Sequence, residues 1–154
     1  MSGDRPVRVF DTSAILALRG DEEGAERVQR LLDEADEGLA TVLLSFMTRM
    51  ELLYVVRREE GEEAALAALR LVDAFPVDWV TCDADILDRS ARIKSEGKLS
   101  VADAWIAATA VERDATLVHC DPEFTGVPRL KQEWLGPTPP RPPSPPERSP
   151  GASP

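Results

Sequence analysis

Four acidic residues lie in this chain where their carboxylates could act together on one ion: Asp11, Glu51, Asp103 and Asp121. Each has an ordinary structural alternative, because aspartates cap helices and a glutamate can lie at the margin of an apolar helix face. One shared site explains the positions of all four acids, whereas the structural alternative requires a separate explanation for each. Carboxylate oxygens without a histidine or thiol among them favour a hard cation, Mg²⁺ or Mn²⁺, and such a cation suits phosphoryl chemistry.

Without a cation the four carboxylates should repel one another, and some should have raised pKa values. Glu51, or an acid beside the metal, could orient the attacking water as a base. Nucleophilic Cys120 with His119 is a poor rival, because neighbours on a strand face opposite ways. Zinc bound by Cys82, Cys120 and His119 is formally possible, but no CxxC or HxxxH spacing supports it. The chain has no glycine-rich motif for nucleotide phosphates.

A helix predicted from Ser100 to about Asp114 positions Asp103 within the stretch LSVADAWIAATA. Ser100 suits the N-cap, and Asp103 follows three residues later, where the acid of a capping box reaches back. Four alanines between residues 104 and 110 favour the helix and let it approach a sheet closely. A carboxylate held against a core costs free energy unless something pairs with it.

Two short apolar strands end at the other aspartates. Val7–Phe10 is followed by Asp11, and Thr116–Cys120 is followed by Asp121, which Pro122 keeps extended. The carboxyl ends of parallel strands form the usual ligand crevice of an open α/β sheet. We therefore expect both aspartates at one edge of the sheet.

The remaining segments alternate between helix and strand. The spacing predicts a helix from about Glu22 to Asp36, a strand at Leu39–Leu44, a helix capped by Ser45 that contains Glu51, a helix at Glu62–Phe75, a strand at Val77–Thr81, a helix from Asp83 or Asp85 to about Glu96, and a weak strand within Val127–Glu133. This alternation predicts an α/β fold, a three-layer α/β/α sandwich around a central, mostly parallel sheet.

Length and composition favour one ordinary domain, residues 1–135, followed by a proline-rich tail. The chain has 154 residues, and nine of its 13 prolines fall in the stretch GPTPPRPPSPPERSPGASP from residue 136 to 154, which we expect to be disordered. No apolar run could span a bilayer and the N-terminus lacks a secretory signal, so we expect no membrane partner. The two cysteines make no disulfide framework, which favours the reducing cytoplasm.

The net charge of −10 normally argues against a nucleic-acid partner. A cation would neutralise acids gathered at a metal site, however, and local basic residues matter more than the sum. Candidates for a basic surface fall on two segments: Arg49, Arg57 and Arg58, and then Arg89, Arg92, Lys94 and Lys98. Solvated helix faces that pair with nearby glutamates explain most of them at least as well.

Four stretches carry a family resemblance: VFDTSA with Asp11, SFMTRMELL with Glu51, LSVADAWIAATA with Asp103 and LVHCDPEF with Asp121. Their order and spacing, over about Val7 to Trp134, resemble the PIN domain and, more narrowly, the VapC-type toxins of bacterial toxin–antitoxin pairs. The resemblance implies a Mg²⁺/Mn²⁺-dependent endoribonuclease that cuts RNA, often tRNA or other structured RNA. It also implies a homodimer and a cognate antitoxin protein that covers the site.

The resemblance further implies roles for individual residues. The metal-binding and catalytic acids would be Asp11, Glu51, Asp103 and Asp121. A small hydroxyl near the first acid often assists in the family, and here it is Thr12 or Ser13, of which we favour Ser13. Family members often carry an aspartate two residues after the position of Asp121. This chain has Glu123 there, with a longer side chain, as an auxiliary candidate.

Two other functions would use the same residues. A non-catalytic PIN-like module that binds RNA or protein would keep Mn²⁺ binding but would never cut RNA. A metal phosphatase or DNA nuclease would share the carboxylates, and only a panel of substrates separates it from a ribonuclease.

Overall fold

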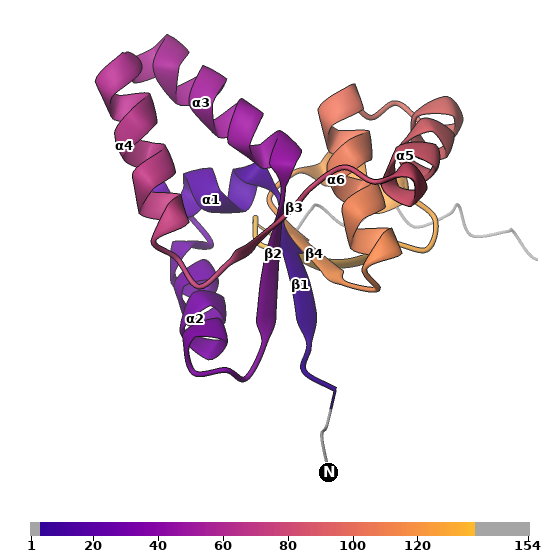
Figure 1. The fold of residues 1–154 in the computed structure, drawn as a ribbon, viewed down its shortest axis with the longest axis horizontal. Helices are drawn as coiled ribbons and strands as arrows, with labels where there is room; N and C mark the ends of the chain where they lie inside the picture. The colour runs from indigo at the N-terminus through magenta and orange to yellow at the C-terminus, as the bar shows by residue number, and fades with distance from the viewer. Residues whose placement is uncertain (1–3, 138–154) are drawn as a thin grey trace, which may run out of the picture.

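Five parallel strands form the central sheet of the protein, seen in a computed structural model that describes residues 4–137 (Figure 1). They are β1 (Val7–Phe10), β2 (Thr41–Ser45), β3 (Asp78–Val80), β4 (Thr116–His119) and β5 (Lys131–Trp134). Their order across the sheet is β3-β2-β1-β4-β5, and each neighbouring pair is parallel. The carboxyl ends of all five strands therefore lie at one edge of the sheet.

Helices cover both faces of this sheet. They are α1 (Thr12–Arg19), α2 (Ala25–Asp36), α3 (Phe46–Glu60), α4 (Glu62–Asp73), α5 (Ala84–Glu96) and α6 (Val101–Glu112). Alternate strand residues point to opposite faces, so Phe10 joins the core formed with α1–α4 while Val9 joins the core formed with α5 and α6. Figure 1 shows these two groups of helices on either side of the strands. The predicted three-layer α/β/α fold is confirmed.

Helix α6 approaches the sheet closely because small side chains line it. Ala104, Ala107 and Ala108 are buried in the same core as Val9. The predicted N-cap is formed, since the Ser100 hydroxyl accepts a hydrogen bond from the backbone N–H of Asp103 at 3.1 Å. This cap fixes the first turn of α6, and with it Asp103, at the carboxyl edge of the sheet.

Several boundaries differ from the prediction for local reasons. Helix α2 begins at Ala25 rather than Glu22, because Gly24 has a φ of +93° and a Cβ there would lie 2.9 Å from the Leu135 side chain. Strand β2 begins at Thr41, which leaves Leu39 exposed. A short 3₁₀ helix, η1 (Pro122–Gly126), separates β4 from β5 where the sequence predicts no helix.

None of the helices within residues 4–137 is long and apolar enough to cross a membrane. Leu135 is buried in the core shared with α1–α4, close to the end of the described part of the chain. Most of the predicted proline-rich tail, from residue 138 onward, lies outside the described residues.

Candidate metal centre

Asp11 uses its two carboxylate oxygens differently. Its Oδ2 caps α1 by accepting hydrogen bonds from the Ser13 backbone N–H at 3.1 Å and from the Ser13 hydroxyl at 2.5 Å. Its Oδ1 is buried and has no hydrogen-bond partner in the described structure. Because only 4% of the residue is exposed, an unpartnered carboxylate oxygen is costly there. The helix cap and a candidate metal ligand are thus supplied by different oxygens of one side chain.

Glu51 lies in the second turn of α3 and is half-buried. The Thr12 hydroxyl, at the start of α1, donates a hydrogen bond to Glu51 Oε1 at 2.9 Å. The same hydroxyl lies 3.2 Å from the hydroxyl of Thr48, which is fully buried one turn before Glu51. Since Thr12 has a single hydroxyl proton, Thr48 acts as donor to Thr12 whenever Thr12 donates to Glu51. Two hydroxyls therefore fix the orientation of the Glu51 carboxylate.

The sequence offers one signal for Thr48, its spacing three residues before Glu51, which is typical of residues on the same helix face. The contact with Thr12 joins α1 to α3 across 36 residues of chain, and such a pairing is visible only once both helices are packed.

Asp103 joins two clusters of carboxylate oxygens. In the first, one ligand atom each from Asp11, Glu51 and Asp103 lie within 4.8 Å of one another. In the second, the same is true of Asp103, Asp121 and Glu123. The structure thus brings together all four acids singled out in the sequence, with Glu123 as a fifth.

The backbone at the end of β4 holds Asp121 beside the cluster. Asp121 is extended, as the following proline predicts, and its Oδ1 accepts a hydrogen bond from the Glu123 N–H at 2.9 Å. The Asp121 N–H donates to His119 Nδ1 at 3.2 Å, which leaves His119 Nε2 to donate to Gln132 Oε1 at 2.9 Å. Burial lowers the pKa of His119. The only histidine of the chain is therefore a neutral, buried group that supports Asp121.

The pKa values of three of these acids, Asp11, Glu51 and Asp103, are raised above their ordinary values. Burial in the protein is the main cause, and the charges of the neighbouring acids add to it. The pKa of Glu51 rises to about 7 and that of Asp103 to about 6. The pKa of Asp11 is also raised, although its hydrogen bonds from Ser13 act in the opposite direction. The cluster thus resists full ionisation at neutral pH.

The donor set fits a hard divalent cation. It consists of carboxylate oxygens alone, which are the ligands that Mg²⁺ and Mn²⁺ prefer. The buried Oδ1 of Asp11 lacks the partner that a cation would provide. The positive charge of a cation among these oxygens would also counter the mutual repulsion that contributes to the raised pKa values.

The thiol and zinc alternatives find no support in residues 4–137. Among these residues, the clusters of possible metal ligands contain only carboxylates. Cys82 is exposed, while Cys120 is half-buried and its N–H donates to the Ser13 hydroxyl at 3.0 Å. Burial raises the pKa of the Cys120 thiol, which is the opposite of what a nucleophile requires.

The basic residues noted in the sequence divide into paired and unpaired groups. Arg57 forms an ion pair with Glu62, and Arg89 forms one with Glu112 at 2.7 Å, so for these two the ion-pair explanation holds. Within the described part of the chain no ion pair is formed by the remaining five: Arg49, Arg58, Arg92, Lys94 and Lys98.

We expect Ser13→Ala to lower the free energy of unfolding by about 1–3 kcal/mol. The Ser13 hydroxyl donates to Asp11 Oδ2 and accepts from the Cys120 N–H, so its loss leaves a part-buried N–H without a partner. Urea unfolding at pH 7 measures the change. The matched control is Ser95→Ala on α5, whose exposed hydroxyl bonds only a helix carbonyl and should change stability by less than about 0.5 kcal/mol. Equal losses in the two variants would contradict this role for Ser13.

Comparisons with known proteins identify the family and the fold of the chain. The PIN domain family matches residues 8–130 of the chain. The chain is similar to a chain of VapBC2 from Rickettsia felis bound to a promoter DNA fragment, with 19% identity and a TM-score of 0.69 over 82% of this chain and 97% of that one. It is similar to a chain of DNA-bound VapBC from Salmonella typhimurium, with 20% identity and a TM-score of 0.69 over 84% and 98%.

A third similar structure is Mycobacterium tuberculosis VapC20, described as a sarcin–ricin-loop cleaving toxin, with 19% identity and a TM-score of 0.60 over 80% of this chain and 98% of that one. Comparison with curated proteins finds no match. At these identities the solved structures establish the fold. Because the family match extends over most of the described residues, the chain belongs to the PIN domain family.

Proposed function

We propose that this protein is a Mg²⁺- or Mn²⁺-dependent endoribonuclease and the toxin of a type II toxin–antitoxin pair. The observation that carries the proposal is the meeting of five carboxylates at the carboxyl edge of a PIN-domain sheet, where Asp11 Oδ1 is buried and has no hydrogen-bond partner among residues 4–137. The description of the similar VapC20 as a toxin that cleaves the sarcin–ricin loop supports RNA as the substrate.

In the proposed site the cation would be held by Asp103, which belongs to both clusters, together with Asp11, Glu51 and Asp121. When bound, Mg²⁺ or Mn²⁺ lowers the pKa of a water molecule and offsets the negative charge of the scissile phosphate. Glu51 is also the candidate general base, because its carboxylate lies in one cluster with Asp11 and Asp103 and the Thr12 hydroxyl occupies only one of its two oxygens. The Thr12 hydroxyl holds Glu51 Oε1, which leaves Oε2 to take the proton of the attacking water.

The proposed protein partners are a cognate antitoxin and a second copy of the chain. The similar VapBC structures from Rickettsia felis and Salmonella typhimurium, each bound to DNA, support a toxin–antitoxin assembly. Exposed apolar side chains on α3 and α4 are suited to a protein contact: Met50, Tyr54, Leu66 and Leu71. An RNA substrate and two free thiols fit the cytoplasm as the place of action.

Incubation of purified protein with total RNA tests the proposal. We expect cleavage at discrete positions in Mn²⁺, no cleavage in EDTA, and recovery when excess Mn²⁺ is restored. A protein that binds Mn²⁺ but cuts no RNA would instead be a non-catalytic binding module. Parallel incubation with DNA and with a phosphomonoester distinguishes the ribonuclease from a DNA nuclease or a phosphatase, and preference for either substrate would contradict the proposal.

A further inference from the structure

A small cavity lies next to the carboxylate cluster on the α5 side. It has a volume of about 170 Å³ and is formed by the end of α5, the loop before α6, and η1 with the residues after it. Ile93, Leu99, Val127 and Pro128 supply apolar walls. Ile93 and Leu99 are themselves buried core residues, so this part of the cavity is held in place by the fold.

Glu123 connects the cavity to the carboxylate cluster. The residue lines the cavity, and one of its carboxylate oxygens lies within 4.8 Å of ligand atoms of Asp103 and Asp121. The two sites therefore share a wall. A phosphodiester held at the carboxylates would have its adjoining nucleoside within reach of the cavity.

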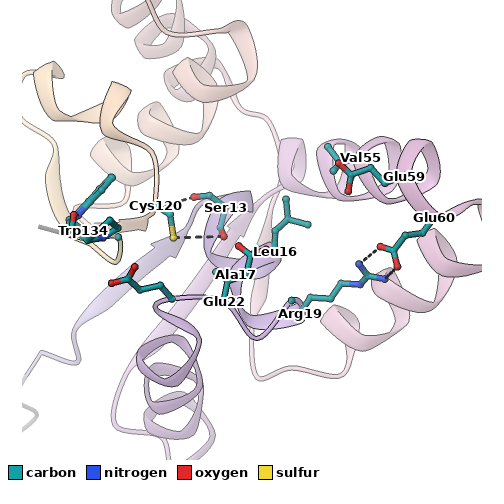
Figure 2. Close-up of a pocket in the computed structure, with 14 residues that line it drawn as sticks. Ser13, Leu16, Ala17, Arg19, Glu22, Val55, Glu59, Glu60, Cys120 and Trp134 are labelled. Atoms are coloured by element: carbon teal, nitrogen blue, oxygen red, sulfur yellow. Dashed lines mark hydrogen bonds and ion pairs between the residues drawn. The ribbon is translucent and has the colours of Figure 1, made fainter. Parts of the chain in front are cut away.

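The opposite side of the cluster is unsuited to a polyanion. A groove of about 990 Å³ begins there at Ser13 and Cys120 (Figure 2). Four glutamates line it: Glu22, Glu23, Glu59 and Glu60. Among the described residues that line it, the one cation is Arg19, which forms an ion pair with Glu60. A nucleic-acid backbone is repelled along this groove. The cavity on the α5 side has fewer acids, Glu96 and Glu123, and a lysine, Lys98, that forms no ion pair within residues 4–137.

The chemistry of the small cavity matches a single base. Its volume is below that of drug-sized ligand pockets, and its apolar walls suit a flat ring that has left a stack. The carboxylate of Glu96 at the same cavity can accept hydrogen bonds from base N–H groups. Lys98, exposed and without an ion pair in the described chain, supplies a cation for the neighbouring phosphate.

We propose that this cavity binds one unstacked nucleobase of the RNA beside the cleaved phosphate, and that Lys98 contacts the RNA backbone there. This inference rests on the proposed ribonuclease function and adds a substrate subsite to it. It predicts that filling the cavity weakens RNA binding without affecting the carboxylate cluster.

The glycines around the cavity allow it to be filled. A Cβ at Gly126 meets no atom within 4 Å, and one at Gly97 has only an ordinary contact of 3.6 Å with the Ile93 carbonyl. Gly126→Leu and Gly97→Leu therefore place a large side chain at two points of the cavity lining without a steric clash at Cβ. Ala67→Leu adds the same kind of bulk at an exposed position on α4, away from the cavity, and serves as the matched control.

RNA affinity is measured by fluorescence anisotropy of a labelled single-stranded RNA, with each substitution placed in an Asp103→Asn background to prevent cleavage. We expect Gly126→Leu and Gly97→Leu to weaken binding about tenfold or more, and Ala67→Leu to leave it unchanged. In the Asp103 wild-type background, Mn²⁺ affinity, which depends on the carboxylates and not on the cavity, should be unchanged in all three variants. The salt dependence of binding should lose about 0.7 in its logarithmic slope in Lys98→Ala and nothing in Lys94→Ala.

These measurements separate the subsite from the function on which it rests. Wild-type affinity in both glycine variants would overturn the subsite, while Mn²⁺-dependent cleavage by the wild-type protein would still support the ribonuclease. A loss of Mn²⁺ affinity in both glycine variants would also overturn it, because the substitutions would then act on the carboxylates. A wild-type protein that neither binds nor cuts RNA would overturn both proposals.

Discussion

Asp103→Asn is expected to reduce RNA cleavage on the order of 10³-fold, equivalent to about 4 kcal/mol of transition-state stabilisation. Asp103 is the one acid shared by both carboxylate clusters, so its loss removes a ligand from each. The substitution nearly preserves the shape of the side chain, and the Ser100 cap depends on the backbone N–H of Asp103 rather than on its carboxylate. Circular dichroism and thermal unfolding should therefore show an intact fold. Initial rates of Mn²⁺-dependent RNA cleavage measure the loss.

The control for Asp103→Asn is Asp85→Asn. Asp85 occupies the first turn of α5, as Asp103 occupies the first turn of α6, so both substitutions remove an acid from a helix N-terminus. Asp85 belongs to neither carboxylate cluster. We expect the Asp85 variant to cleave RNA within about twofold of the wild-type rate. Equal rates for wild type and Asp103→Asn would show that this cluster is not the site of cleavage.

The second large effect is a pH-dependent stabilisation by Mn²⁺. Burial raises the pKa of Glu51 from 4.5 to about 7 and that of Asp103 from 3.8 to about 6. Between the ordinary and the raised pKa values, the folded protein binds more protons than the unfolded chain. The free energy of unfolding without metal therefore falls as the pH rises from about 4 to about 7. Mn²⁺ binds the ionised carboxylates and competes with those protons. Its stabilising effect should therefore be larger at pH 8 than at pH 5.5.

Thermal unfolding with EDTA or with Mn²⁺ at about a hundred times its dissociation constant measures this coupling. Such an excess corresponds to about 2.7 kcal/mol, or roughly 5–10 °C in Tm for a chain of this size, at pH 8. At pH 5.5 the same Mn²⁺ concentration should raise the Tm by only a small part of that amount. Asp103→Asn should lose most of the increase at both pH values. An increase of the same size at pH 5.5 and pH 8 would contradict the assignment of protonated acids to the metal centre.

The sequence predicts the framework well where a local pattern coincides with the tertiary structure. Strand β1 is a short apolar run closed by Asp11, and α6 begins at a serine followed by small residues, so both elements are present as expected. Boundaries shifted where a distant residue decides the conformation. The start of α2 depends on the close approach of Gly24 to Leu135, which lies more than a hundred residues later in the chain.

The candidate site is likewise predictable from the sequence only in part. Its four acids could be placed at one sheet edge because parallel strands have their carboxyl ends in common. The sharing of Asp103 between two clusters, and the buried hydroxyl of Thr48 behind Thr12, arise from how α1, α3 and α6 pack. No spacing within one segment encodes such contacts. The tautomer of His119 likewise depends on the Asp121 N–H and on Gln132 Oε1, which only the folded chain brings beside the ring.

The two carboxylate oxygens of Asp11 have different roles, which limits how this protein can be inactivated without destabilising its fold. A replacement without a side-chain oxygen, such as alanine, removes the unpartnered oxygen and the oxygen that begins α1 together, so the candidate chemistry and the helix cap are lost in one step. A silenced form for trapping RNA or for safe overproduction is better made at Asp103, where the scaffold depends on the main chain. For the same reason random mutation at Asp11 should yield few folded but inactive proteins, whereas Asp103 is a position where they can accumulate.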